Sequence, residues 1–164
     1  RPIWTNAVDA FGPLDHPEYG RASRDGEPRY EDALVSLWRW RDDFQNDFAA
    51  RMDWTVQPYA EANHPPEVVL GQPRHITVRS GQGFGLTARD SHDPDGDSLS
   101  FHWFHYPEAG TYEGEPLTLI NGANLWTTAP TVTEPVTLHI LVRVTDKGSP
   151  PLTRYGRTIV TVQP

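Results

Sequence analysis

The feature that most constrains the fold is an acidic turn followed at once by a strand of alternating residues. The turn, Asp-Pro-Asp-Gly-Asp, covers residues 93–97, and the strand follows it over 99–106. Along this strand a period of two sends Leu99, Phe101 and Trp103 to one face. A strand that places a large aromatic residue on its inner face is typical of the core of a β-sandwich.

Further short strand patterns, separated by turns rich in Gly, Pro and Asp, continue from Pro65-Pro66 to the C-terminus. The expected strands cover residues 68–70, 75–79, 84–88, 99–106, 117–120, 126–128, 136–145 and 154–162. No helical periodicity lies between them, which indicates an all-β unit. We therefore predict a mainly β fold, with an immunoglobulin-like antiparallel β-sandwich over residues 63–164.

The N-terminal part of the chain has a different pattern. Residues 1–30 are irregular, whereas apolar residues between Tyr30 and Met52 recur at spacings of three and four. This spacing predicts an amphipathic helix over about 31–52, with Glu31 and Asp32 favouring its N-terminus through the helix dipole. Pro65-Pro66 restricts the preceding residues to extended conformations, so we predict a separate segment, helix and linker, over 1–62.

Charge and composition exclude several classes of function. The net charge is −8 with no basic stripe, which argues against nucleic acid and anionic membrane surfaces as partners. No apolar run reaches the roughly 18–20 residues of a membrane span. The absence of cysteine excludes disulfides, thiol nucleophiles and thiolate zinc sites. Because the chain opens at Arg1 without a signal-peptide pattern, we expect it to be the C-terminal part of a longer protein.

Four motifs occur in order along most of the chain. They are Phe-Ala-Ala-Arg-Met-Asp-Trp-Thr (48–55), Asn-His-Pro-Pro (63–66), Tyr-Pro-Glu-Ala-Gly-Thr-Tyr (106–112) and Asp-Lys-Gly-Ser-Pro-Pro-Leu-Thr-Arg-Tyr (146–155). Together they resemble the C-terminal region of a bacterial family of cellulose-binding proteins with a nucleoside-hydrolase-like N-terminal domain. The resemblance implies that residues 1–62 are the tail of that hydrolase-like domain and a linker.

The same resemblance implies a function. The fragment would be a non-catalytic carbohydrate-binding module of a secreted or periplasmic bacterial protein of polysaccharide degradation. Its partners would be cellulose or another plant cell-wall glycan, and the hydrolase-like domain of the same protein. The aspartate-rich calcium cluster of the family's hydrolase half has no counterpart here, so hydrolase activity does not carry over. The alternative is a structural sandwich, stabilised by calcium, that caps the hydrolase-like domain without binding sugar.

A calcium site is suggested by the acidic turn, since carboxylates at alternate positions can converge on a hard cation. The turn and its flanking segments also resemble bacterial polycystic-kidney-disease-type and cadherin-like modules. That resemblance implies one Ca²⁺ at the pole where the linker enters, held by Asn63, Asp93, Asp95 and Asp146, with Asp97 and Asp90 as possible additions. The alternative is that Asp93 to Gly96 is only a turn and Asp146 lies in a plain hairpin.

Aromatic side chains are the candidates for sugar binding, because exposed rings form platforms for sugar faces. The outer row of the strand over 99–106 contains His102, Phe104 and Tyr106. Unless something covers this row it is exposed, and we favour covering by the predicted helix, whose Trp38, Phe44 and Phe48 also need a partner surface. The full set of candidate sugar-binding residues is Phe104, Tyr106, Tyr112, Trp126 and Tyr155.

No catalytic arrangement stands out in the sequence. His92, His102 and His105 lie near acidic residues, but no serine or cysteine occupies a nucleophile-elbow context. Glu108 and Glu113 are the one carboxylate pair considered for glycoside hydrolysis, and loop glutamates are usually solvated. We therefore predict no catalytic residues.

Overall fold

The computed structural model describes residues 9–11, 30–32 and 40–164. Two short strands, β1 (Asp9–Phe11) and β2 (Tyr30–Asp32), pair antiparallel, and helix α2 (Arg41–Asp53) follows. After the one-turn helix η3 (Tyr59–Glu61) the chain enters the β unit. Its elements are β3 (His75–Arg79), β4 (Gly83–Thr87), β5 (Ser100–His105), η4 (Pro107–Ala109), β6 (Asn124–Thr128), β7 (Val136–Thr145) and β8 (Thr153–Gln163).

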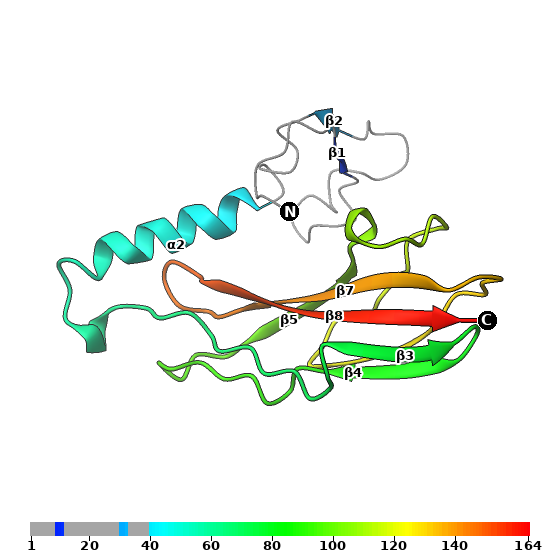
Figure 1. The fold of residues 1–164 in the computed structure, drawn as a ribbon. Helices are drawn as coiled ribbons and strands as arrows, with labels where there is room; N and C mark the ends of the chain where they lie inside the picture. Colours follow the sequence, from blue (N-terminus) through cyan, green and yellow to red (C-terminus); the bar gives the residue numbers. More distant parts are fainter. Residues whose placement is uncertain (1–8, 12–29, 33–39) are drawn as a thin grey trace.

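These strands form two sheets, one of four strands in the order β3-β8-β7-β5 and one of the two strands β4-β6. The pair β3-β8 is parallel, and the other pairs are antiparallel (Figure 1). The predicted β-sandwich is confirmed, but the prediction that it is antiparallel throughout is wrong, because β3 pairs parallel to β8. Trp103 lies in its core, and the finer description of the sandwich as immunoglobulin-like stays a prediction.

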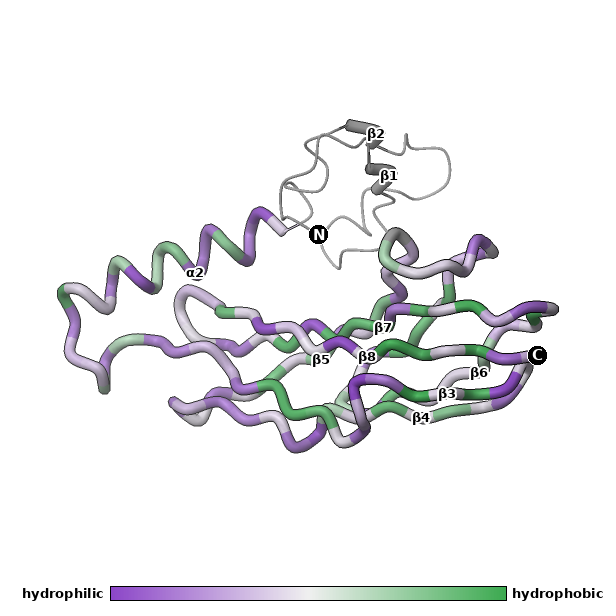
Figure 2. Tube along the Cα trace, in the orientation of Figure 1, coloured by the Kyte–Doolittle hydropathy of each residue, from purple (hydrophilic) through white to green (hydrophobic). Residues whose placement is uncertain are grey.

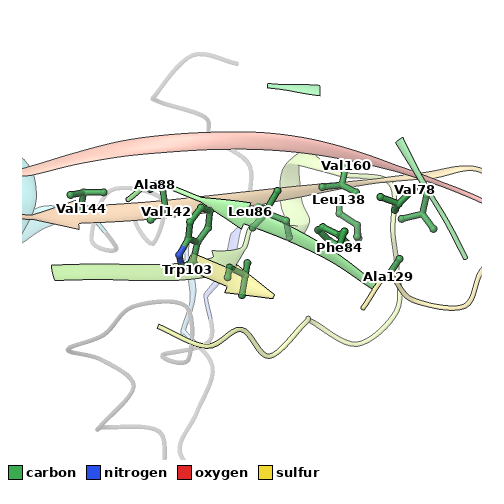
Figure 3. Close-up of a cluster of buried hydrophobic side chains, with 13 residues drawn as sticks. Val78, Phe84, Leu86, Ala88, Trp103, Ala129, Leu138, Val142, Val144 and Val160 are labelled. Atoms are coloured by element: carbon green, nitrogen blue, oxygen red, sulfur yellow. The ribbon is translucent and has the colours of Figure 1, made fainter. Parts of the chain in front are cut away.

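The core lies between the two sheets, where alternate side chains of each strand point inward (Figure 3). Trp103 is 2% exposed, and its indole Nε1–H donates to the carbonyl of Gly122 at 2.8 Å. The hydrogen bond satisfies the polar atom that burial of a tryptophan would otherwise leave unpaired. The buried members of the core are Val78, Phe84, Leu86, Ala88, Trp103, Leu125, Ala129, Leu138, Ile140, Val142, Val144, Val160 and Val162.

Two predicted strands, 68–70 and 117–120, are not strands. Val68, Leu70, Leu117 and Leu119 nevertheless pack against the core, which accounts for their apolar character. Segment 68–70 lies so close to β8 that a Cβ at Gly156 would be 2.9 Å from Leu70 Cδ2 and 3.0 Å from Val68 Cγ1. These segments contribute burial without joining a ladder of backbone hydrogen bonds.

The predicted helix is confirmed only in its second half. Glu31 and Asp32, expected in its first turn, belong to β2. The helix begins at Arg41 because Trp40 has a non-helical backbone, and its acidic first-turn residues are Asp42 and Asp43. The predicted stretch 33–39, which includes Trp38, lies outside the described residues.

The docking of the helix also differs from the prediction. Phe44 and Phe48, expected to pack on the sandwich, are 44% and 63% exposed. Hydrophilic and hydrophobic residues alternate along α2 (Figure 2), and the buried residues of the helix are Asp43 and Ala50. The helix is held instead by charged groups, chiefly Asp43 and Asp47, which contact β7 and β8.

Candidate functional site

The outer face of the small sheet carries the most exposed tryptophan that the structure describes. Trp126 lies on β6, is 72% exposed, and pairs in register with Gly85 of β4. Its neighbour Leu125 is 2% exposed and faces the core. The period of two along β6 thus directs Trp126 away from the core, where its ring is available to a ligand.

The neighbouring strand leaves room for this ring to lie flat. A Cβ at Gly83 would be 3.2 Å from one ring carbon of Trp126, and a Cβ at Gly85 would be 3.0 Å from another. The indole therefore covers two residues that have no side chain, with one face against the β4 backbone and the other toward solvent. In the sequence, Gly83-Phe84-Gly85-Leu86 alternates glycine with core residues, and strand glycines of this kind often mark a close approach.

Polar side chains border the ring on the same face. Thr87 donates a hydrogen bond from Oγ1 to Oδ1 of Asn124 at 2.6 Å. Thr87 and Asn124 are opposite each other in the register, two residues along from Gly85 and Trp126, and Thr128 is exposed beyond the ring. The result is an aromatic surface with amide and hydroxyl groups beside it, the combination that sugar recognition requires.

Phe104 and Tyr106, two of the predicted sugar-binding residues, lie under Trp40. Phe104 is 6% exposed, and its ring centroid lies 6.1 Å from that of Trp40. Tyr106 meets the same indole edge-on at 6.3 Å. The prediction that Phe104 offers a ring to sugar is therefore wrong. The row is covered as expected, but by the residue preceding the helix rather than by Phe44 or Phe48.

Tyr112 and Tyr155 are also engaged in contacts within the protein. Tyr112 packs against the core, with its ring 6.2 Å from that of His105. Tyr155 is 36% exposed, meets Trp40 edge-on at 5.2 Å, and donates its hydroxyl hydrogen to the carboxylate of Asp43. Burial and the negative charge of Asp43 raise the pKa of Tyr155. Neither ring forms a free flat surface comparable to Trp126.

The sequence analysis did not predict the polar cluster of Asp43, Arg143 and Tyr155, in which the Tyr155 hydroxyl donates to Asp43. Asp43 accepts hydrogen bonds from both Nε (3.2 Å) and Nη2 of Arg143, and this ion pair is largely buried. Burial lowers the pKa of Arg143, but hydrogen bonding to and the charge of Asp43 outweigh it, so that the pKa is raised. No local sequence signal pairs residues this far apart.

The predicted calcium ligands gather at the pole where the linker meets the sandwich. Asn63 donates from Nδ2 to Asp146 Oδ2 at 3.2 Å, and Asp95 accepts hydrogen bonds from the backbone N–H of His64 at 2.6 Å. Asp93 Oδ1 accepts from the backbone of Asp95 at 2.9 Å. The three segments therefore meet in space.

Whether these residues could bind a cation depends on which of their carboxylate oxygens already accept hydrogen bonds. Asp146 accepts from the backbone N–H groups of Gly148 (3.0 Å) and Leu152 (2.8 Å) as well as from Asn63, so its carboxylate organises the β7–β8 loop. Asp93 Oδ2, in contrast, is buried without a hydrogen-bond partner. Burial raises the pKa of Asp146, and the charge of Asp93 raises it further.

The arrangement thus fits a cation in part: one carboxylate oxygen lacks a partner and two carboxylates repel each other. Asp90 is exposed and pairs with Arg89, and Asp97 donates its backbone N–H to Asp93 Oδ1. Among the residues that the structure describes, no group of three or more His, Asp or Glu side chains is arranged to hold a metal ion.

The candidate histidines His92 and His105 lie in different environments. His105 is 3% exposed, and both its ring nitrogens lack hydrogen-bond partners. Burial, together with the nearby His139, lowers the pKa of His105 to about 4. His92 lies elsewhere, exposed and 3.4 Å from Glu67. The side chain of Glu108 lies outside the described residues, so the pair Glu108 and Glu113 stays untested.

Comparison with known proteins adds to this geometry. No curated protein matches the chain. In the described part of the chain, no helix is both long and apolar enough to cross a membrane. A solved structure, that of a nucleoside hydrolase-related hypothetical protein from Saccharophagus degradans associated with carbohydrate metabolism, is similar at 33% identity and a TM-score of 0.71. The match covers 85% of this chain but only 34% of that one.

A family profile matches the sandwich itself. The match covers residues 83–162, from the start of β4 almost to the end of β8, and includes Trp103 and Trp126. The resemblance predicted from the motifs is confirmed: residues 83–162 have the sequence pattern of the family described as the C-terminal domain of cellulose-binding protein Sde0182.

Proposed function

We propose that this chain is a non-catalytic carbohydrate-binding module and that Trp126 is its principal contact with a glycan. The observation that carries the proposal is the exposed indole lying flat over Gly83 and Gly85. A sugar ring presents an apolar face of C–H groups, which stacks on an aromatic ring while neighbouring polar groups bond its hydroxyls. Asn124 and Thr128, two residues to either side of Trp126 on β6, would supply these polar groups.

The glycan class follows from the shape of this surface and from the family description. The indole lies on a sheet face rather than in a cleft, and such a surface suits an extended chain lying flat, as in cellulose or a related plant cell-wall glycan. The family is described as cellulose-binding, and the similar solved structure is associated with carbohydrate metabolism. Both support the proposal of a secreted or periplasmic bacterial protein in which a hydrolase-like domain accompanies this module.

Retention on insoluble cellulose, with affinity electrophoresis in soluble glucans, tests the proposal. The parent chain should be retained, and Trp126→Ala should lose most of this retention. Phe48→Ala is the matched control, because it removes an exposed aromatic ring from α2 and leaves the β4–β6 face intact. Equal retention of the parent and Trp126→Ala, or no retention of the parent on any glucan, would contradict the proposal.

A second proposal concerns calcium at the linker pole, and it is supported by the unpartnered Asp93 Oδ2 beside Asp146. A Ca²⁺ held by Asn63, Asp93, Asp95 and Asp146 would remove the repulsion between these carboxylates and tie the linker to the sandwich. Such an ion would suit either a sugar-binding module or a sandwich that only caps the hydrolase-like domain.

Thermal unfolding in excess chelator and then in millimolar calcium tests this second proposal. Binding to the folded state alone would raise the parent's Tm by mass action. Asp93→Asn keeps the Oδ1 acceptor that organises the turn but removes the charge, so its Tm should not respond. A parent Tm that is the same under both conditions would show that the acidic turn is only a turn.

A further inference from the structure

A groove of about 560 Å³ runs along the outer face of β8, beside the segment that leads into β3. Its volume lies within the range of small-ligand sites. The polar and aromatic residues that line it are Gln72, Arg74, His75, Tyr155 and Arg157. Gln72 forms part of the wall, because its amide bridges Thr158 Oγ1 (2.9 Å) and the backbone N–H of Thr87 (2.8 Å).

Among the side chains that the structure describes, the two arginines of the groove have no acidic partner. Within residues 40–164, neither Arg74 nor Arg157 has a carboxylate oxygen within 4.0 Å, whereas Arg51, Arg89, Arg143 and Arg154 each pair with an aspartate. The chain as a whole has a net charge of −8, whereas the two arginines make this groove locally positive. Such a region attracts anionic ligands and raises their local concentration.

Two histidines lie beside the groove, on the strands that flank β8. His139 lies opposite Ile159 in the β7–β8 register, and His75 lies opposite Ile159 on the other side. Burial lowers the pKa of His139, and the charges of Arg157 and His75 lower it further. The positive charge of Arg157 therefore acts on the neighbouring strand, and a bound anion would offset it.

We propose that this groove is a second glycan site, which binds the carboxylate groups of an acidic polysaccharide through Arg74 and Arg157. Guanidinium groups pair with carboxylates through two parallel hydrogen bonds, and two uronic acid residues would supply one carboxylate to each of the two arginines. Tyr155 also lines the groove, but its ring is engaged by Trp40, so the two arginines carry the proposed site. The inference rests on the proposed carbohydrate-binding function, to which it adds a ligand class.

This site is separate from Trp126. Arg157 lies between the buried residues Gly156 and Thr158, so it points outward from the four-stranded sheet. Trp126 points outward from the two-stranded sheet, and the core lies between the two sheets. Substitutions at one site should therefore leave the other unchanged.

Isothermal titration calorimetry of the whole chain at low ionic strength tests the inference, with tetragalacturonate, its fully methyl-esterified form and cellohexaose as probes. The ester has the same sugar rings without the charge. We expect the parent to bind tetragalacturonate and not the ester. Arg157→Gln and Arg74→Gln should each weaken binding about tenfold, and a rise in salt should weaken it in the parent. Arg79→Gln, which removes an exposed arginine of β3 outside the groove, should change it less than twofold.

The same titrations separate this inference from the proposed function. Trp126→Ala should lose cellohexaose binding and keep tetragalacturonate binding. If the parent binds cellohexaose but not tetragalacturonate, or binds acid and ester equally, the groove inference is wrong and the proposed function stands. If Trp126→Ala abolishes the binding of both probes, there is one site, on the β4–β6 face, and the groove is not a binding site.

Discussion

The sandwich and helix α2 are held in place by opposite kinds of contact. Between the two sheets, apolar side chains such as Trp103 and Val142 are buried almost completely. Helix α2 instead turns Asp43 and Asp47 toward β7 and β8 and leaves Phe44, Phe48 and Met52 exposed. The sandwich is therefore stabilised mainly by the hydrophobic effect, and the attachment of the helix depends on a small number of charged groups.

The largest expected effect comes from the centre of the sandwich. Trp103→Ala removes a 2% exposed side chain and its hydrogen bond to Gly122, which should lower the free energy of unfolding by about 3–5 kcal/mol. Urea denaturation measures this loss. The matched control is Trp126→Ala, which removes an exposed indole and should cost less than about 1 kcal/mol. Equal losses at the two tryptophans would contradict the assignment of core and surface.

The next largest effect is expected from Asp43, which attaches the helix to the sandwich. Asp43→Ala leaves the guanidinium of Arg143 buried without its partner and removes the acceptor of the Tyr155 hydroxyl, so we expect a loss of about 3 kcal/mol in urea denaturation. The neighbouring Asp42→Ala should cost less than about 1 kcal/mol, since Asp42 contributes through the helix dipole alone. Replacing Arg143 by Leu in the Asp43→Ala background should recover part of the loss. A similar effect of the two aspartate substitutions would show that the ion pair does not hold the helix.

Stability should fall as the pH is lowered from 7.5 to 5. Burial lowers the pKa of His105 to about 4, so the unfolded chain, with an ordinary value near 6.5, binds the proton more tightly than the folded protein. The stabilisation is complete above about pH 6.5 and is lost toward pH 4, at up to about 1.4 kcal/mol per pH unit. His102 and His139, whose pKa values burial also lowers, act in the same direction.

Urea denaturation of His105→Leu at several pH values tests this point. The substitution removes two buried ring nitrogens that have no partner, so the slope of stability against pH should decrease and stability at pH 5 should rise. The exposed His92 provides the control, and His92→Leu should keep the parent's slope. An unchanged slope in His105→Leu would assign the pH dependence to other groups.

The smallest expected effect lies on the outward face of the helix. Phe48 is 63% exposed, so Phe48→Ser should change the free energy of unfolding by no more than about 0.5 kcal/mol. Thermal or urea denaturation of the parent and of Phe48→Ser would detect a larger change in the free energy of unfolding. A loss above about 2 kcal/mol would mean that Phe48 is buried in solution and that the contrast between helix and sandwich is wrong.

The strands could be predicted well because a period of two and turn residues are local signals. Residues 75–79 and 136–145 form strands with the predicted bounds, and Trp103 is in the core as expected. The helix was predicted less well, because its start at Arg41 and its orientation depend on Asp43 meeting Arg143, 100 residues away. Apolar spacing alone could not show that Phe44 and Phe48 face outward.

The candidate site could be predicted only as a set of aromatic residues. Which of them is available depends on contacts made across the fold: Trp40 covers Phe104, and Asp43 engages Tyr155. Trp126 is available because strand pairing places it opposite Gly85. The alternation of glycine over 83–86 was a visible signal, but its meaning required the register of β4 and β6.

The most direct test of the central claim compares two tryptophans during one titration. In two-dimensional NMR spectra of the chain, cellohexaose should shift the indole N–H signal of Trp126, identified by its loss in Trp126→Phe. The buried indole of Trp103 should not respond. Backbone signals of Gly83 and Gly85 should move together with Trp126. If the Trp126 signal stays in place while other indole signals shift, or if no signal shifts at saturating cellohexaose, the proposed glycan-binding face is wrong.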